Sequence, residues 1–407
     1  MTQSAASADA VATAASTDGR EARRPLDGIT VVEIGTSVAA PYACLVLADL
    51  GARIVKVENP DGGDYARGWG PPFWGDTSST FVALNRGKQS VTLDLASPDG
   101  NAALRALIVD EADVVVQNLR PGLLEKFGFD VDALRREKPS LIWCDIGAFG
   151  TRGPLREKPG YDPLAQATAG IMSVTGEPAR PPVRVGVSLV DMGSGMWSVI
   201  GVLAQLLERE RTGAGGRIQT SLFETALAWM TIPLANYEAS GEVLPPQGSG
   251  TQQIVPYQAF RARDAWLMIA AGNDNLFRKL CRVLDRPDLA ENDVYATNAG
   301  RVRSRDALIA TLQQTIATFD AQPLAERLDA AGVPNAPLLG VEDVPTHPQT
   351  VALQMRAPCD GDTLPLMGIP LSFDGLRPRS TARSPSLGEH NATWIDQDAI
   401  RESTHED

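Results

Sequence analysis

Short apolar runs rich in β-branched residues recur through the first 150 residues, and amphipathic stretches separate them. The runs at 29–34, 52–58, 88–95, 113–118 and 140–146 predict five strands. The stretches at 39–50 and 97–109 predict helices, the second with Ser97 as N-cap and Pro98 in its first turn. Strands alternating with helices predict an α/β fold with a Rossmann-like parallel sheet covered on both faces.

The pattern changes in the middle of the chain. A hairpin is predicted around Arg263-Asp264, followed by a strand at 266–270 and helices at 274–284, 303–318 and 322–331. We assign residues 231–335 to a smaller α+β domain, and residues 25–230 and 336–407 to the large domain. Residues 1–24, rich in Ala, Ser and Thr, predict a disordered tail, and the chain ends in an acidic tail.

Composition narrows the chemistry. A net charge of −13 over 407 residues argues against nucleic acid or an acidic membrane surface as partner, and no apolar run approaches the roughly 20 residues of a membrane helix. Four scattered cysteines indicate reduced thiols in a cytoplasmic protein. The three histidines lack metal-ligand spacing and no G-x-S-x-G motif is present, so we expect no metal site and favour carboxylate chemistry.

The first strand–helix–strand unit resembles a dinucleotide site in one respect only. Glu58 ends the second strand, as the acidic residue of an NAD site would. The loop Gly35-Thr-Ser-Val-Ala-Ala-Pro41 lacks the G-x-G-x-x-G glycines that let backbone approach a pyrophosphate. The sequence therefore argues against NAD.

Asp191 is the most informative carboxylate. It lies in Val190-Asp191-Met-Gly-Ser-Gly195, where an extended segment leads into a helix predicted to be buried and to stop at Gly213. One interpretation is a helix N-cap, for which Asp is favoured. The other is a carboxylate nucleophile whose glycine neighbours admit a ligand and whose nearby N–H groups stabilise an oxyanion.

Several stretches together resemble the class III CoA-transferases, a family that includes formyl-CoA transferase and carnitine CoA-transferase. The resemblance covers about residues 25–391. It rests on Pro25–Glu33, Leu50–Glu58, Asn85–Lys88, Asp113–Gly122, Gly147–Gly150, Gly160–Asp162, Asp191–Gly195, Glu208–Gly213 and Gly388–Asn391, in this order. Each motif is weak alone, and their shared order is specific.

The resemblance implies an interlocked homodimer, coenzyme A as part of the acyl-CoA substrate, and Asp191 as nucleophile. The reaction would transfer CoA from an acyl-CoA to a small carboxylic acid, a dicarboxylic acid being one option, through a covalent aspartyl intermediate. Implied CoA contacts are Val38, Ala39, Asn59, Leu93, Asp94, Leu95, Ala96, Asn118, Leu119, Arg120, Lys126, Lys158, Tyr161 and Asp162.

Covering loops and an acceptor clamp complete the expected site. The loop Trp69–Trp74 and the loop with Gly248, Gly250 and Gln252 are candidate lids that keep water from a reactive anhydride. Arg184 or Arg67 is a candidate clamp for the acceptor carboxylate.

Two alternatives remain open. Racemases of the same superfamily carry a His-Asp pair where this chain has Tyr161-Asp162, and Tyr, with a reference pKa of about 10, is a poor proton shuttle at neutral pH. This departure favours a transferase over an acyl-CoA racemase. A non-catalytic CoA-binding protein is the second alternative.

Overall fold

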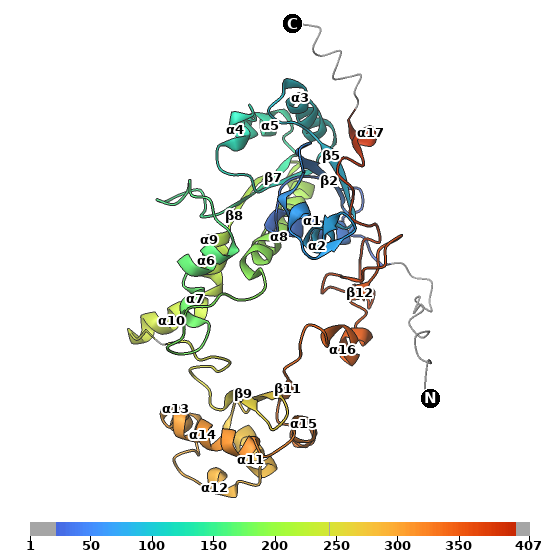
Figure 1. Cartoon of the computed structure of the whole chain (residues 1–407). Coiled ribbons are helices and arrows are strands. Elements are labelled where there is room, and N and C mark those ends of the chain that lie inside the picture. The colour runs from blue at the N-terminus through green and yellow to red at the C-terminus, as the bar shows by residue number, and fades with distance from the viewer. Residues whose placement is uncertain (1–21, 244, 396–407) are drawn as a thin grey trace, which may run out of the picture. The chain divides into compact units, whose positions relative to one another are not determined.

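The computed structural model describes residues 22–243 and 245–395. The predicted tails at 1–24 and 396–407 therefore lie almost wholly outside the described residues. The described residues divide into two units (Figure 1): the first holds 22–145, 198–218 and 355–395, and the second holds 146–197 and the described part of 219–354.

The first unit is built on a six-stranded sheet. Its order is β5-β2-β1-β6-β7-β8, and the pairs β2–β5, β1–β2, β1–β6 and β6–β7 are parallel. The strands are β1 (Thr30–Ile34), β2 (Arg53–Glu58), β5 (Lys88–Thr92), β6 (Val114–Gln117), β7 (Ile142–Gly147) and β8 (Arg217–Ser221). The five predicted strands and the α/β class are confirmed.

Alternating side chains of these strands face two helical layers. Val32, Val55, Val115 and Trp143 join one apolar cluster with the helices α3 (Pro98–Ala106), η2 (Leu107–Glu111), α4 (Leu123–Lys126) and α5 (Val131–Glu137). α1 (Ala39–Asp49) contacts β1 and β2, and α2 (Ser79–Asn85) packs against α1. Short elements of this unit are η1 (Tyr65–Gly68), β3 (Phe73–Trp74), β4 (Thr77–Ser78), β12 (Arg356–Ala357), β13 (Leu366–Met367) and α17 (Asn391–Trp394).

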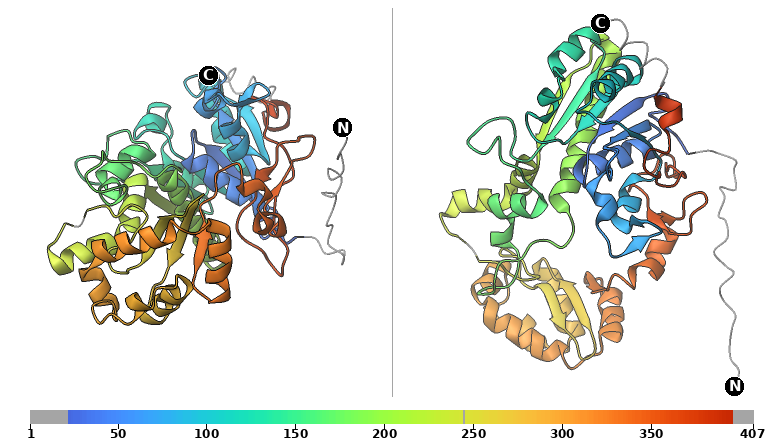
Figure 2. Two further views of the ribbon diagram at one scale, coloured as in Figure 1. Left: turned by 60° about the horizontal axis from the view of Figure 1, so that its bottom comes forward. Right: turned by 45° about the horizontal axis from the view of Figure 1, so that its top comes forward.

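The second unit contains an antiparallel three-stranded sheet, β11-β10-β9. Its strands are β9 (Tyr257–Arg261), β10 (Trp266–Ala270) and β11 (Asn335–Pro337), and α11 (Asp274–Val283), α12 (Pro287–Ala290), α13 (Asn298–Arg303), α14 (Arg305–Ile316) and α15 (Ala321–Ala330) accompany them (Figure 2). The predicted hairpin and helices are confirmed. The unit also contains α6 (Asp162–Thr168), α7 (Ile171–Val174), α9 (Leu222–Trp229), α10 (Thr231–Ser240), η3 (Val344–Thr346) and α16 (Pro348–Ala352).

These units differ from the predicted domains at both boundaries. Helices α6, α7, α9 and α10 pack on one another, so residues 146–197 and 219–230 belong to the second unit although they follow sheet strands. β11 pairs with β10, and the chain leaves this unit only after Gln354.

Helix α8 (Leu189–Thr212) begins in the second unit and ends in the first. It was predicted to be buried, but it exposes the apolar side chains of Met196, Trp197, Ile200, Leu203 and Leu207. Because it begins well before Ser198, it is longer than the apolar run suggested. Its length and composition would suffice to cross a membrane, a test that core helices of soluble proteins also pass.

Candidate active site

The first turn of α8 is capped by a residue from another segment. The backbone N–H groups of Val190 and Asp191 donate to Oδ2 of Asp162, at 2.7 and 3.2 Å. Asp162 is the first residue of α6 and is buried. Helix N-termini need such acceptors, because their first N–H groups lack partners within the helix. The interpretation of Asp191 as the N-cap is therefore wrong: it lies inside the first turn.

The Asp191 carboxyl has no partner of this kind. It is half-buried, and within 22–243 and 245–395 no residue makes a hydrogen bond or ion pair with its side chain. Burial, and then the negative charge of Asp162, raise its pKa to about 7. Burial and a neighbouring negative charge make the ionised form of Asp191 less stable than that of a solvated carboxylate, as expected of a reactive group.

One glycine beside Asp191 serves packing. A Cβ at Gly193 would lie 2.9 Å from the Trp229 ring and 3.0 Å from Thr225, both on α9. This glycine therefore allows α8 and α9 to approach closely, a role that the sequence did not distinguish from ligand access.

Gln166 is a polar residue that the sequence analysis missed. Its Nε2 donates to Asp162 Oδ1 at 2.5 Å, and its Oε1 accepts the Val185 N–H at 2.9 Å. Both oxygens of the Asp162 carboxyl thus accept hydrogen bonds from the protein itself. Through Gln166, the loop that carries Arg184 is hydrogen-bonded to α6. Its position one helical turn after Asp162 was the available signal.

Three other residues of the second unit that were expected to bind ligands are exposed. Tyr161 is 58% exposed, and Lys158 and Arg184 are exposed as well. The Arg184 guanidinium donates only to the carbonyls of Val185 and Gly186 among the residues that the structure describes. It therefore has donors to offer a ligand carboxylate.

In the first unit, most expected CoA contacts follow the carboxyl ends of adjacent strands. Val38 and Ala39 follow β1, Asn59 follows β2, the turn from Leu93 to Ala96 follows β5, and Asn118 to Arg120 follow β6. Lys126, exposed in α4, is the exception. Ligands of open α/β sheets bind at this edge.

Arg67 is occupied by the fold. Its Nε and Nη2 donate to the two carboxyl oxygens of Glu58 at 2.8 and 2.7 Å, and its guanidinium stacks 3.8 Å from the Phe81 ring centre. Of the two candidate clamps, Arg184 is the one without a carboxylate partner in the described chain.

The two candidate lids are anchored separately. In the first, Trp69 is 44% exposed and Trp74 Nε1 donates to Asp362 at 2.8 Å. In the second, the Gly248 N–H donates to the Gly176 carbonyl at 2.8 Å and Gln252 Nε2 to the Pro245 carbonyl at 3.3 Å, while Gly250 is half-buried.

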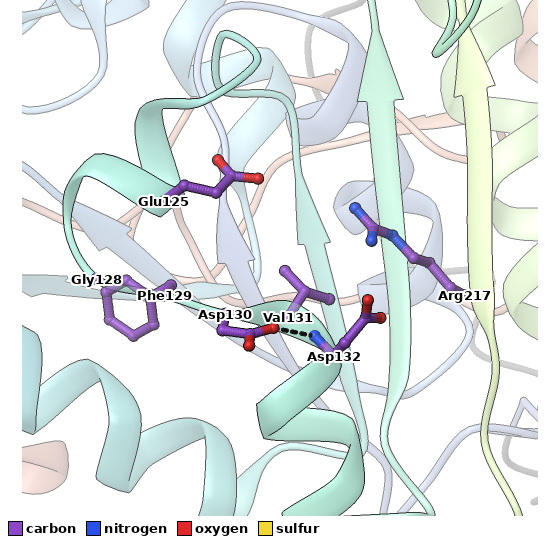
Figure 3. Close-up of a pocket in the computed structure, with 7 residues that line it drawn as sticks. All are labelled: Glu125, Gly128, Phe129, Asp130, Val131, Asp132 and Arg217. Carbon is purple, nitrogen blue, oxygen red and sulfur yellow. Dashed lines mark hydrogen bonds between the residues drawn. The ribbon is translucent and has the colours of Figure 1, made fainter.

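A pocket in the first unit does not match the expected ligand. Figure 3 shows Glu125, Asp130 and Asp132 around it with Arg217 as its cation, and Arg217 is paired with Asp145 at 2.7 Å. A lining with this excess of carboxylates repels the phosphates of CoA.

Comparisons with known proteins identify the family of the chain. The model of CoA-transferase family III matches residues 26–391. The chain belongs to this family. It is an enzyme of the class III CoA-transferases, which use CoA thioesters as substrates.

Relatives cover nearly the whole chain. Succinate–glutarate CoA-transferase of Agrobacterium fabrum is 36% identical, over 92% of this chain and 96% of its own. Acetyl-CoA:oxalate CoA-transferase of Acetobacter aceti is 37% identical, over 90% and 94%. The solved structure of a CaiB/BaiF family protein from Brucella suis superposes with a TM-score of 0.83 at 38% identity, over 94% of this chain and all of that one.

Proposed function

We propose that this CoA-transferase moves CoA from an acyl-CoA donor to a small dicarboxylic acid, with Asp191 as the nucleophile. The observation that carries the assignment is that the Asp191 carboxyl has no hydrogen bond or ion pair with any described residue and lies beside the N–H groups that Asp162 accepts. The dicarboxylic acceptor is supported by relatives named for succinate, glutarate and oxalate and by the Arg184 guanidinium, which has no carboxylate partner among the described residues.

The reaction exchanges acyl partners at one carboxylate. Ionised Asp191 attacks the thioester carbonyl, the C–S bond breaks, and CoA leaves as thiolate with a mixed anhydride behind. The thiolate attacks the Asp191 carbonyl and releases the donor acid. The acceptor carboxylate then attacks the aspartyl-CoA thioester, which forms a second anhydride and releases the thiolate. The thiolate attacks the acceptor's acyl carbonyl in this anhydride, forms the new acyl-CoA and releases Asp191 as a carboxylate.

The chain supplies groups for each step. CoA contacts come from the loops at the carboxyl edge of the first unit, together with Lys126, Lys158 and Tyr161. Arg184 binds the distal carboxylate of the acceptor. The loops with Trp69 and with Gly248, Gly250 and Gln252 exclude water, which would hydrolyse the anhydrides.

The enzyme acts as a homodimer in the cytoplasm. The exposed apolar stripe of α8 supports a second copy as its covering partner, because spacings of three and four residues place its side chains on one helix face. All four cysteines are buried free thiols, which fits a reducing compartment. Light scattering at micromolar concentration should give the dimer mass, and a monomer would contradict this.

A substrate screen tests the transfer itself. Acyl-CoA donors are incubated with mono- and dicarboxylic acids, and new CoA thioesters are identified by mass spectrometry. Transfer to dicarboxylic acids is the expected result. Exchange of the α-proton with solvent deuterium and no transfer would instead identify a racemase.

A further inference from the structure

The loop between β1 and α1, residues 35–38, is held by a side chain from the neighbouring strand end. Asn118, the first residue after β6, accepts the Thr36 N–H at its Oδ1 and donates from its Nδ2 to the Thr36 carbonyl, both at 2.9 Å. One amide side chain thus satisfies both backbone groups of Thr36, as a paired strand would.

The same loop is fixed from the β2 side. Lys56 Nζ donates to the Gly35 carbonyl at 2.7 Å, and Asp64 Oδ1 accepts the Ser37 N–H at 2.9 Å. Asp64 Oδ2 lies 2.9 Å from Lys56 Nζ, and both side chains are fully buried. Ser37 has φ of 70°, a left-handed conformation that non-glycine residues keep only where their surroundings impose it.

This loop borders the point where the strand order reverses. From β1 the sheet continues through β2 on one side and through β6 on the other. Ligands of open α/β sheets bind outside the carboxyl ends of the strands at such a point. The two hydrogen bonds between Asn118 and Thr36 therefore join the ends of β6 and β1 at the position where a ligand is expected to bind.

We propose that Asn118 acts on acyl-CoA through Thr36: it is a positioning residue that holds residues 35–38 in the conformation that receives CoA. This inference rests on the proposed function. Its side-chain amide is committed to Thr36, so it serves the ligand by shaping the loop. A loop fixed before binding spares the ligand the cost of ordering it.

The test compares two amides with equivalent bonds. Asn118→Ala should raise the Kd for CoA, measured by calorimetry, and the KM for acyl-CoA by about tenfold or more, with kcat at saturation changed less than about threefold. The control is Gln313→Ala in the second unit. Gln313 accepts the Arg261 N–H at 3.0 Å and donates to the Arg261 carbonyl at 2.7 Å, so its loss removes the same pair of bonds. The Kd for CoA and the KM for acyl-CoA of the Gln313→Ala variant should match those of the parent protein.

A second variant disturbs the loop while Asn118 itself is retained. A Cβ at Gly35 would lie 2.5 Å from the Cβ of Ala40 and 3.2 Å from Asn118 Oδ1, so Gly35→Ala must shift the loop. It should raise the Kd for CoA as Asn118→Ala does. Unchanged CoA binding in both variants, or equal weakening in Gln313→Ala, would overturn the inference. A parent protein that binds no CoA would overturn the proposed function instead.

Discussion

Glu33 of the first unit and Asp191 of the second are both shielded from water, but the charges beside them have opposite signs. Two ammonium groups, those of Lys56 and Lys88, each lie 2.7 Å from a Glu33 oxygen. Burial opposes ionisation of Glu33, but the two lysine charges outweigh it and lower its pKa. Asp191 has Asp162 near it and no ion pair among the described residues, and its pKa is raised to about 7.

The arginines repeat the contrast. Arg67 of the first unit donates to Glu58 through two nitrogens, whereas Arg184 of the second donates, within the described part of the chain, only to backbone carbonyls. In the first unit, Glu33 and Arg67 are therefore neutralised by partners within the fold. In the second unit, Asp191 and Arg184 have no oppositely charged partner among the described residues. The sign of a side chain's charge does not separate structural from reactive residues. The presence or absence of an oppositely charged neighbour does.

The largest expected effect comes from Asp191→Asn. Removal of the nucleophile should lower kcat by at least about 10⁴-fold, as for other catalytic nucleophiles. Steady-state transfer between two acyl groups measures it. The matched control is Asp130→Asn at the N-cap of α5, where the carboxyl accepts two backbone N–H groups, and its kcat should stay near that of the parent.

Lys56→Met should be the most destabilising of these changes. It leaves the buried Glu33 and Asp64 carboxylates short of a counter-charge, and breaking a buried pair in this way costs about 3–5 kcal/mol. Urea unfolding measures the loss. Lys126→Met, at an exposed lysine, should change stability by no more than about 0.5 kcal/mol. Equal effects of both would show that the network does not stabilise the first unit.

Asp191→Asn should stabilise the folded protein at pH 8. Because the folded pKa of Asp191 lies above its unfolded value, stability present at low pH is lost as pH rises from about 4 to about 7. A rise in the pKa of Asp191 to about 7 corresponds to about 4 kcal/mol, and partial exposure reduces the expected gain in stability to about 2 kcal/mol. The gain should vanish near pH 4, where the parent carboxyl is neutral. A gain independent of pH would mean that charge is not its cause.

Arg184→Ala should weaken acceptor use. Loss of a charged hydrogen bond to the distal carboxylate should raise the KM for a dicarboxylic acceptor by about tenfold or more. The KM for a monocarboxylic acceptor should change little. Arg180→Ala, an exposed arginine in the same loop, is the control, and an equal response of both acceptors would exclude a clamp.

The smallest effect concerns the pH dependence of transfer. kcat/KM should rise with pH up to about 7, as Asp191 ionises. Asp162→Asn removes a neighbouring negative charge and keeps an oxygen for the N–H groups of Val190 and Asp191, while its NH2 replaces the oxygen that accepts from Gln166 Nε2. This limb should move to lower pH by less than about one unit. Asp130→Asn should leave the limb in place.

Local patterns carried the sequence prediction far. β-branched runs located β1, β2, β5, β6 and β7, and the hairpin and helices of the α+β region followed from periodicity. Asp191 was singled out because carboxylates were the plausible reactive groups and its motif matched the family. Placement after strand ends then grouped most expected CoA contacts of the first unit at one edge.

The remainder depends on contacts between distant residues. Asn118 is hydrogen-bonded to Thr36, which is 82 residues away in the sequence, and Asp162 to Val190, which is 28 residues away. Neither role is therefore visible in a local sequence pattern. The burial of α8 was misjudged because an apolar run in the sequence does not show which of its side chains the chain's own fold covers.

The most direct test of the account is to trap the intermediate on Asp191. The enzyme is incubated with acyl-CoA alone, then treated with hydroxylamine or borohydride, and its peptides are analysed by mass spectrometry. We expect an aspartyl hydroxamate, or the reduced alcohol, on the peptide containing Val190-Asp191-Met192, and none in Asp191→Asn. An adduct on Glu58, Asp162 or Asp274, or no adduct together with α-proton exchange, would contradict the assignment of Asp191 as nucleophile.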